Sequence, residues 1–153
     1  MVTANDYLSY VSDLDANRWT KPYKVSGKKE IASALYLKNT IPNASGVVFR
    51  KSVLEAVLVD HGEEIISYRN AGDWVTYLRV LERGNIAFTP RPLNDHRRHS
   101  GSVTIGSANQ RHYNEIIKVQ KDIIERHGLG SGAAERAGRY AMQVAKHFGL
   151  ETS

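Results

Sequence analysis

The chain has 153 residues, of which 41% are hydrophobic and 24% charged, and it contains no cysteine. This composition is typical of one globular domain and excludes a disordered polar chain, because enough apolar side chains are present to fill a core. Without cysteine, disulfides and thiolate metal sites are excluded, so a metal would need His, Asp, Glu or phosphate ligands. The formal charge of +5 favours anionic partners such as nucleotides, nucleic acids or lipid head groups.

The sequence also argues against a membrane-spanning or secreted chain. It contains no apolar run that approaches the roughly 18–20 residues of a membrane-spanning helix. The first six residues lack the basic and then apolar order of a secretory signal. We therefore expect a chain without a transmembrane segment that remains in the cytoplasm.

The N-terminal part of the chain predicts two helices separated by a loop. Apolar residues within 6–14 follow the spacing of a short amphipathic helix, whereas residues 19–23 are an expected loop around Pro22. Ser26 is a suitable cap for a longer helix over residues 27–39, where apolar side chains recur at helical spacing.

The middle of the chain predicts short strands that alternate with helices. Residues 46–49 and 86–88 are short runs rich in apolar residues, which is typical of strands. A capping-box pattern opens an expected helix over residues 52–59. A further helix is expected over residues 74–83, with Asp73 as its N-cap.

The C-terminal part predicts a helical hairpin. Isoleucines recur at helical spacing over residues 113–124, glycines interrupt the pattern at residues 128–132, and a second helix is expected over residues 133–148. We therefore predict an α/β part over residues 1–106, mostly helical with few short strands, followed by the hairpin over residues 107–153. Two short strands leave open sheet edges, so either helices dominate the first part or it is the second half of a larger sheet domain.

Asp73 and the polar turn that follows the second predicted strand form the most informative pattern for function. The turn contains the run Asn-Asp-His-Arg-Arg-His at residues 94–99. A carboxylate can accept a proton, and imidazole and guanidinium groups can bind phosphate oxygens or a metal ion. These are the groups that a transfer from a phosphorylated donor requires.

Three motifs occur in an order and spacing that resemble the later part of bacterial family 2 glycosyltransferases. They are Asn-Thr-Ile-Pro-Asn-Ala-Ser-Gly-Val-Val-Phe-Arg-Lys at residues 39–51, Ala-Gly-Asp-Trp at residues 71–74, and the His-Arg-Arg-His turn within residues 93–104. The resemblance covers roughly residues 7–104. It implies the second half of a GT-A fold, the fold of nucleotide-diphospho-sugar transferases.

The resemblance also implies that the donor-binding half is missing. In that family an N-terminal half carries an Asp-x-Asp motif, which holds a metal ion and the sugar-nucleotide diphosphate. Asp13-Leu14-Asp15 has the letters of this motif but follows no buried apolar strand, so we interpret it as a solvated turn. We expect the chain to be the acceptor side of a transferase domain that lacks the Asp-x-Asp donor-binding half, and the sequence leaves open whether it is active in isolation.

Asp73 matches the residue that acts as the base in this family. The implied reaction is an inverting transfer of a sugar from a nucleotide-diphosphate donor to an acceptor hydroxyl, in surface polysaccharide or glycan assembly. From the residues alone, Asp73 is also explained as an N-cap that stabilises its helix by about 1 kcal/mol. The two roles are compatible.

Several residues are candidates for substrate binding. Asn43, Ser45 and Arg50 match the family segment that shapes the acceptor pocket, although a strand start followed by a basic helix start explains them equally. Trp74, together with Tyr77, could stack on a sugar ring. Aromatic residues at helical spacing are more often part of a core, so that alternative remains open.

The cationic turn supplies the candidate donor and metal ligands. Arg97 and Arg98 offer forked donors to a diphosphate, or form a solvated surface. His99 matches a late histidine that reaches the metal or diphosphate in the family, with His96 as the alternative ligand. The resemblance implies a divalent metal, Mg or Mn, for the intact enzyme, and none bound tightly by this chain alone. Two histidines do not complete a zinc shell, so a separate zinc site is not expected.

The resemblance predicts a nucleotide-sugar donor and a glycan or lipid-linked acceptor as partners, in the cytoplasm or peripherally at the inner face of the membrane. The C-terminal helices are a candidate homodimer face. One alternative is a noncatalytic partner or remnant that needs a separate donor-binding chain. A second alternative is a basic nucleic-acid-binding helical module, but acidic residues are interspersed with the basic ones and no recognised reader motif occurs, so nucleic acid is not expected.

Overall fold

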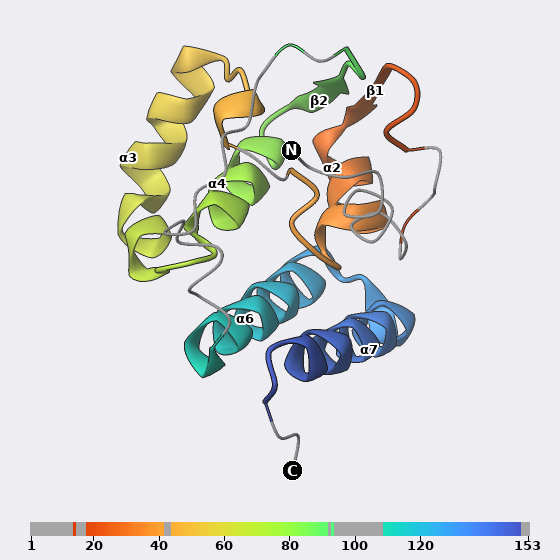
Figure 1. Ribbon diagram of the computed structural model, residues 1–153. Coiled ribbons are helices and arrows are strands. Elements are labelled where there is room, and N and C mark those ends of the chain that lie inside the picture. The colour runs from red at the N-terminus through yellow and green to blue at the C-terminus, as the bar shows by residue number, and fades with distance from the viewer. Residues whose placement is uncertain (1–13, 15–17, 42–43, 92, 94–108, 151–153) are drawn as a thin grey trace.

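The computed structural model describes residues 14, 18–41, 44–91, 93 and 109–150, and these are mostly helical, with one two-stranded sheet. In chain order the elements are β1 (Tyr23–Ser26), α2 (Gly27–Glu30), the π-helical turn η1 (Ile31–Leu35), the 3-10 turn η2 (Ala44–Gly46), α3 (Lys51–Ser67), α4 (Gly72–Leu81), β2 (Asn85–Phe88), α6 (Gln110–His127) and α7 (Gly130–His147). The sheet lies at one end of the molecule and the α6–α7 pair at the other (Figure 1). The mixture of helices with a small sheet agrees with the predicted class.

The sheet is antiparallel and joins segments that are far apart in the sequence. Tyr23 lies opposite Phe88, and Ser26 lies opposite Asn85. The prediction of β2 is confirmed, but the prediction of a loop over residues 19–23 is wrong at its end, because β1 begins at Tyr23. The strand forms because a distant partner offers an edge for pairing, which the local sequence does not reveal.

The predicted strand over residues 46–49 is wrong. Ala44–Gly46 form a 3-10 turn, and residues 47–50 have no partner strand among the described residues. Val48 is 98% exposed. The β-branched and aromatic residues Val47, Val48 and Phe49 favour an extended backbone, but a strand also needs an adjacent edge.

The helix predicted over residues 52–59 extends further than expected, and its capping box is wrong. α3 spans Lys51–Ser67, and its N-cap is Arg50, which makes no side-chain capping bond. Gly62 lies within the helix and faces open space. A glycine in a helix costs only about 1 kcal/mol relative to alanine, so the packing of α3 on α4 outweighs it.

The helix that contains Asp73 begins two residues earlier than predicted. α4 starts at Gly72 after the N-cap Ala71, so Asp73 lies in the first turn, and its prediction as the N-cap is wrong. The backbone before the helix is held instead by Glu115 of α6. Its carboxylate accepts hydrogen bonds from the N–H groups of Arg69, Asn70 and Ala71 at 3.0, 2.8 and 3.0 Å.

α2 and η1 confirm a helix that starts after Ser26, but its second part is π-helical and it ends at Leu35, before the predicted end at residue 39. The Ser26 hydroxyl accepts a hydrogen bond from the Lys29 N–H at 3.2 Å. Gly27 packs so tightly against α4 that an added Cβ would lie 1.8 Å from the Leu81 carbonyl oxygen. Only glycine fits this approach between α2 and α4.

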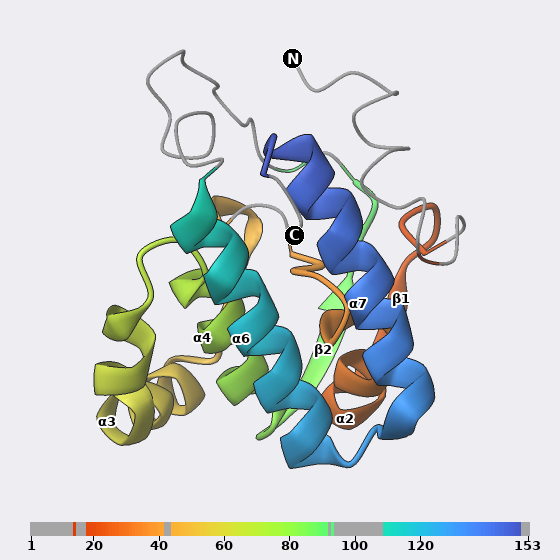
Figure 2. The ribbon, with the colours of Figure 1, turned by 90° about the horizontal axis from the view of Figure 1, so that it is seen from below.

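The predicted helical hairpin is confirmed. α6 is capped by Asn109, whose side chain accepts from the His112 N–H at 3.0 Å, and it ends at Gly128 with a left-handed φ of 59°. α6 and α7 lie side by side across the rest of the molecule (Figure 2). No helix among the described residues is long and apolar enough to cross a membrane.

One hydrophobic core spans both predicted parts of the chain. Ile123 of α6 packs in the same cluster as Leu35 and Leu78, and the Gln120 side-chain amide donates to the Leu37 carbonyl at 2.7 Å. The boundary predicted between residues 106 and 107 lies outside the described residues. The hairpin is therefore a layer of the same core as the helices before it.

A buried arginine links three helices. Arg79 of α4 is fully buried, and its guanidinium pairs with Glu64 of α3 at 2.5 Å, Glu82 at 3.1 Å and Asp122 of α6 at 3.1 Å. Such a buried cation is stabilised only while its carboxylate partners remain in place. The network therefore fixes α4 relative to α3 and α6.

Candidate active site

Asp73 carries the most unusual carboxylate of the candidate site. Its Oδ1 accepts a hydrogen bond from the Trp74 N–H at 2.7 Å, and its Oδ2 accepts one from the Asn39 side-chain amide at 3.3 Å. The Asn39 Oδ1 accepts from the Ile41 N–H at 3.1 Å, so the Nδ2 group must face Asp73. Both carboxylate oxygens are thus oriented, one by α4 and one by the segment after η1.

The environment makes Asp73 a stronger base than an ordinary aspartate. Its side chain remains accessible to solvent, but partial burial of the carboxylate among protein atoms raises its pKa above the ordinary value of 3.8. The hydrogen bonds from Trp74 and Asn39, and the charge of His112, lower the pKa but do not cancel the burial effect. An accessible, oriented carboxylate with a raised pKa is suited to accept a proton.

Tyr77 lies one helical turn after Asp73. The residue is 2% exposed, and its ring stacks on Phe49 with ring centroids 6.1 Å apart. Its buried hydroxyl has no hydrogen-bond partner among the described residues. Burial and the charge of Asp73 raise the pKa of Tyr77 to about 12, so the hydroxyl stays protonated and can donate a hydrogen bond.

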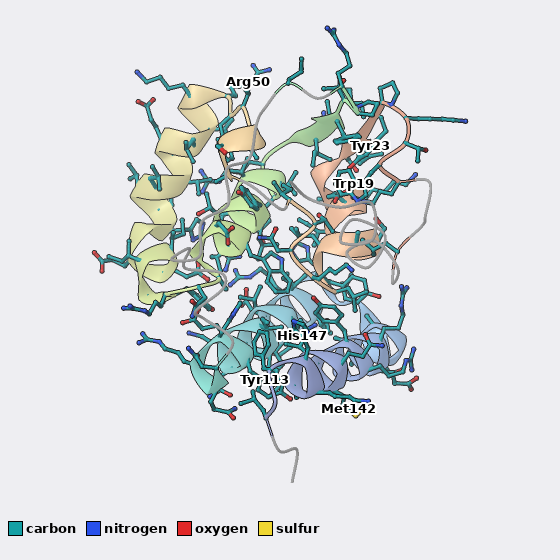
Figure 3. The ribbon with its side chains drawn as sticks, viewed as in Figure 1. Trp19, Tyr23, Arg50, Tyr113, Met142 and His147 are labelled. Atoms are coloured by element: carbon teal, nitrogen blue, oxygen red, sulfur yellow. The ribbon has the colours of Figure 1, made fainter. Side chains whose placement is uncertain are left out.

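A groove of about 770 Å³ runs between β2 and residues 46–50, with α4 beneath it. We refer to it as the α4–β2 groove. Tyr77 lines it from α4, Phe88 lines it from β2, and the exposed Arg50 lines it on the opposite side. Figure 3 shows Arg50 at the end of the molecule that is far from the α6–α7 pair, and Trp19 beside Tyr23 near the sheet.

The structure places some of the predicted substrate-binding residues together and separates others. Arg50 and Tyr77 line the same groove, whereas Ser45 is exposed in η2 and is not part of the groove lining within the described chain. Trp74 is 3% exposed, and its indole N–H donates to the Leu35 carbonyl at 3.0 Å. The Trp74 side chain is therefore buried, as the core alternative predicts, and its role as a stacking platform stays a prediction.

The remaining predicted residues lie outside the described part of the chain. They are Asn43, His96, Arg97, Arg98 and His99. Among the residues that the structure does describe, no group of three or more His, Asp and Glu side chains could hold a metal ion.

Asn39 is the site residue that the sequence analysis missed. It was interpreted only as the end of a helix, although it begins the first of the three motifs. The Asn39 side-chain oxygen accepts a hydrogen bond from the backbone N–H of Ile41, two residues later, and an asparagine in such a position stabilises a turn. Asparagine at this place in the sequence therefore indicates a turn, but nothing in the local sequence indicates a contact with Asp73.

Comparison of the chain with models of protein families, with curated proteins and with solved structures finds no match. The function must therefore be argued from the geometry around Asp73 and from the motifs of the sequence.

Proposed function

We propose that the chain is the acceptor side of a sugar-nucleotide-dependent glycosyltransferase, with Asp73 as the catalytic base. The observation that carries this proposal is the Asp73 carboxylate. It is accessible, it accepts hydrogen bonds from Asn39 and Trp74, and its pKa is raised. The order of the three sequence motifs supports the same assignment.

In the proposed reaction the acceptor hydroxyl lies within about 2.6–3.2 Å of a free lone pair of Asp73. The hydroxyl oxygen attacks the anomeric carbon of the donor sugar while its proton passes to the carboxylate. The bond between the anomeric carbon and the diphosphate oxygen breaks, and the nucleoside diphosphate leaves with the bonding electrons. Attack opposite the leaving group inverts the anomeric configuration.

The chain's own contribution is to activate the acceptor. The pKa of Asp73 is raised, so it lies closer to the working pH than the pKa of an ordinary aspartate does. This increases the driving force for proton transfer to the carboxylate. The resemblance assigns the donor nucleotide and its Mg²⁺ or Mn²⁺ to another half of the domain, where the metal would offset the charge of the leaving diphosphate. The proposed acceptor is a glycan or lipid-linked sugar of surface polysaccharide assembly.

A second candidate function is that of a noncatalytic partner for a separate donor-binding chain. The observation that favours it is the two-stranded sheet, whose strands have four residues each and leave an edge of β2 unpaired among the described residues. Such a sheet is a small remnant compared with the sheets of typical α/β domains.

The proposal is tested by NMR titration of the labelled full chain with a panel of methyl glycosides. We expect saturable shifts of the Asp73, Asn39 and Tyr77 signals with one or more glycosides. Asp60→Asn is a matched control, because this exposed carboxylate pairs with Arg83, just after the end of α4, and should leave the glycoside shifts unchanged.

A glycoside panel that leaves all three signals unmoved would count against the proposal. A separate titration in which duplex DNA binds at the same residues in a salt-dependent manner would favour the nucleic-acid alternative. A parallel titration with uridine and guanosine diphosphates plus magnesium reports whether the chain also retains a donor site.

A further inference from the structure

The backbone of β2 presents an edge that is ready for pairing. Gly27 N–H donates to the Gly84 carbonyl at 2.8 Å, in register with Val25 opposite Ile86. Hydrogen-bonded and non-hydrogen-bonded pairs alternate along an antiparallel ladder. The N–H and C=O groups of Ala87 therefore point away from β1, and within the described chain no strand pairs with them.

Ala87 lines the α4–β2 groove, and the segment across the groove also has no partner strand within the described part of the chain. Residues 47–50 form this second side, and Arg50 has an extended backbone with φ of −69° and ψ of 115°. Val48 in the same segment is almost fully exposed. Two stretches of backbone that could both pair with a strand thus line one groove.

The base of the groove favours a ligand with hydrogen-bond acceptors and apolar groups. Leu81, Val80 and the aromatic ring of Tyr77 supply apolar surface from α4. Tyr77 and Trp19 both line the groove, and in the described part of the chain the hydroxyl of one and the indole N–H of the other are buried without partners. A buried donor without a partner is unfavourable, so a small shift of the groove lining that lets an incoming carbonyl reach it would relieve that cost.

The charge of the groove selects the kind of side chain that such a ligand would carry. Lys24 and Arg50 are exposed at the groove, and both are cations. Arg83, which also lines it, is already paired with Asp60 at 2.6 Å. The complementary partner carries carboxylates near Lys24 and Arg50.

We propose that the α4–β2 groove binds an extended strand of a second polypeptide, in which apolar side chains alternate with carboxylates. The strand pairs with the backbone of Ala87 and continues the sheet beyond β2, the mode known as β-augmentation. Its apolar side chains cover the groove base, and its carboxylates face Lys24 and Arg50. The groove shares Tyr77 and Arg50 with the candidate transferase site, but the strand itself pairs with the backbone of β2 and involves no atom of Asp73 or Asn39.

The test uses the full chain and a capped peptide of alternating glutamate and valine. Amide hydrogen exchange is measured by NMR with and without the peptide. At a peptide concentration about ten times the Kd, exchange of the Ala87 amide should slow by about tenfold. The equivalent peptide with lysine in place of glutamate should protect Ala87 much less.

Two variants show whether the binding uses the proposed edge and charge. Ala87→Pro removes the outward N–H but no ladder bond to β1, so the fold should persist and peptide binding should be lost. Arg50→Glu should weaken binding, whereas Lys51→Glu should not, because Lys51 is the exposed neighbour that pairs with Glu55 and does not line the groove.

Several results would overturn the proposal. They are an Ala87 amide that the glutamate peptide does not protect, equal protection by the lysine peptide, and peptide binding that survives in Ala87→Pro. Retained exchange protection of the Ile86 amide in Ala87→Pro establishes that loss of binding does not come from loss of the sheet.

Discussion

Asn39 and Asp73 are 34 residues apart in the chain, and the Asn39 amide donates a hydrogen bond to the Asp73 carboxylate at 3.3 Å. The Asn39 oxygen is occupied by the Ile41 N–H, so the amide cannot rotate without losing that bond. Asn39 therefore links the backbone at the side of the α4–β2 groove, where Ile41 lies, to the candidate base.

The first prediction concerns the pKa of Asp73 in Asn39→Ala. In the wild type, the hydrogen bond from Asn39 stabilises the ionised carboxylate of Asp73. Asn39→Ala removes this bond, so the pKa of Asp73 should rise further above the ordinary value of 3.8. Carboxyl ¹³C NMR over a pH series measures this pKa directly. Asn114→Ala is the control, because Asn114 is an exposed residue of α6 whose side chain accepts from Gln110. A pKa that stays the same or falls in Asn39→Ala would contradict the prediction.

The second prediction concerns the stability of Asp73→Asn. Because the folded-state pKa of Asp73 is raised, the fold favours its protonated form, and stability falls as pH rises through the interval between the unfolded and folded pKa values. Asp73→Asn removes this ionisation, so its Tm should exceed that of the wild type at pH 7. The difference should shrink below pH 3.8, where Asp73 is protonated in both states.

Asp60→Asn provides a control of opposite sign for this experiment. Its hydrogen bond with Arg83 lowers the pKa of Asp60, so its carboxylate stabilises the fold at neutral pH and this stability is lost as pH falls. Asp60→Asn should therefore have a lower Tm than the wild type at pH 7. Equal effects of the two substitutions would show that amide isosteres alone, and not the two environments, determine the change.

The third prediction concerns the buried cation Arg79. In Arg79→Met the carboxylates of Glu64 and Asp122 lose their shared partner, so the free energy of unfolding should fall by about 3–5 kcal/mol. The pKa values of both carboxylates, which Arg79 helps to lower, should rise. Urea denaturation measures the first effect and NMR the second. Arg69→Met, at an exposed position before α4, should change stability by no more than about 0.5 kcal/mol, and a similar loss in both variants would refute the prediction.

The fourth prediction concerns Glu115, whose carboxylate accepts three backbone N–H groups. Glu115→Gln replaces one of the two acceptor oxygens with an NH₂ group, which cannot accept a hydrogen bond from a backbone N–H. The free energy of unfolding at pH 7 should therefore fall by about 1–3 kcal/mol. The three hydrogen bonds lower the pKa of Glu115, so its contribution is present above the ordinary value of 4.5 and is lost as pH falls through the folded-state pKa. Urea titrations at several pH values measure the difference. A difference that persists unchanged at acidic pH would contradict the proposed cause.

Elements with strong local signals were predictable from the sequence. The isoleucine stripe and the glycine break predict α6 and α7 without help from the rest of the chain. The cap at Ser26 likewise defines the start of α2. In these elements the local preference and the tertiary contacts agree.

Elements that depend on distant partners were not predictable. β1 exists because β2 pairs with it, and the first turn of α4 is shifted because Glu115 binds the backbone in front of it. The same holds for the candidate site, where the carboxylate of Asp73 was found but its partner Asn39 was not. A contact between side chains of different segments leaves no periodic pattern in the sequence.

The contact between Glu115 and the residues before α4 also sets an order of events during synthesis. α4 leaves the ribosome before α6, because protein chains are made from the N-terminus and domains fold as their segments emerge. The N–H groups that precede α4 therefore stay without their carboxylate acceptor until residue 115 has emerged. The hydrogen bonds that hold the backbone before Asp73 form only when the C-terminal hairpin docks. In a nascent chain stalled before α6, the helix that carries the proposed base would therefore lack these hydrogen bonds at its start.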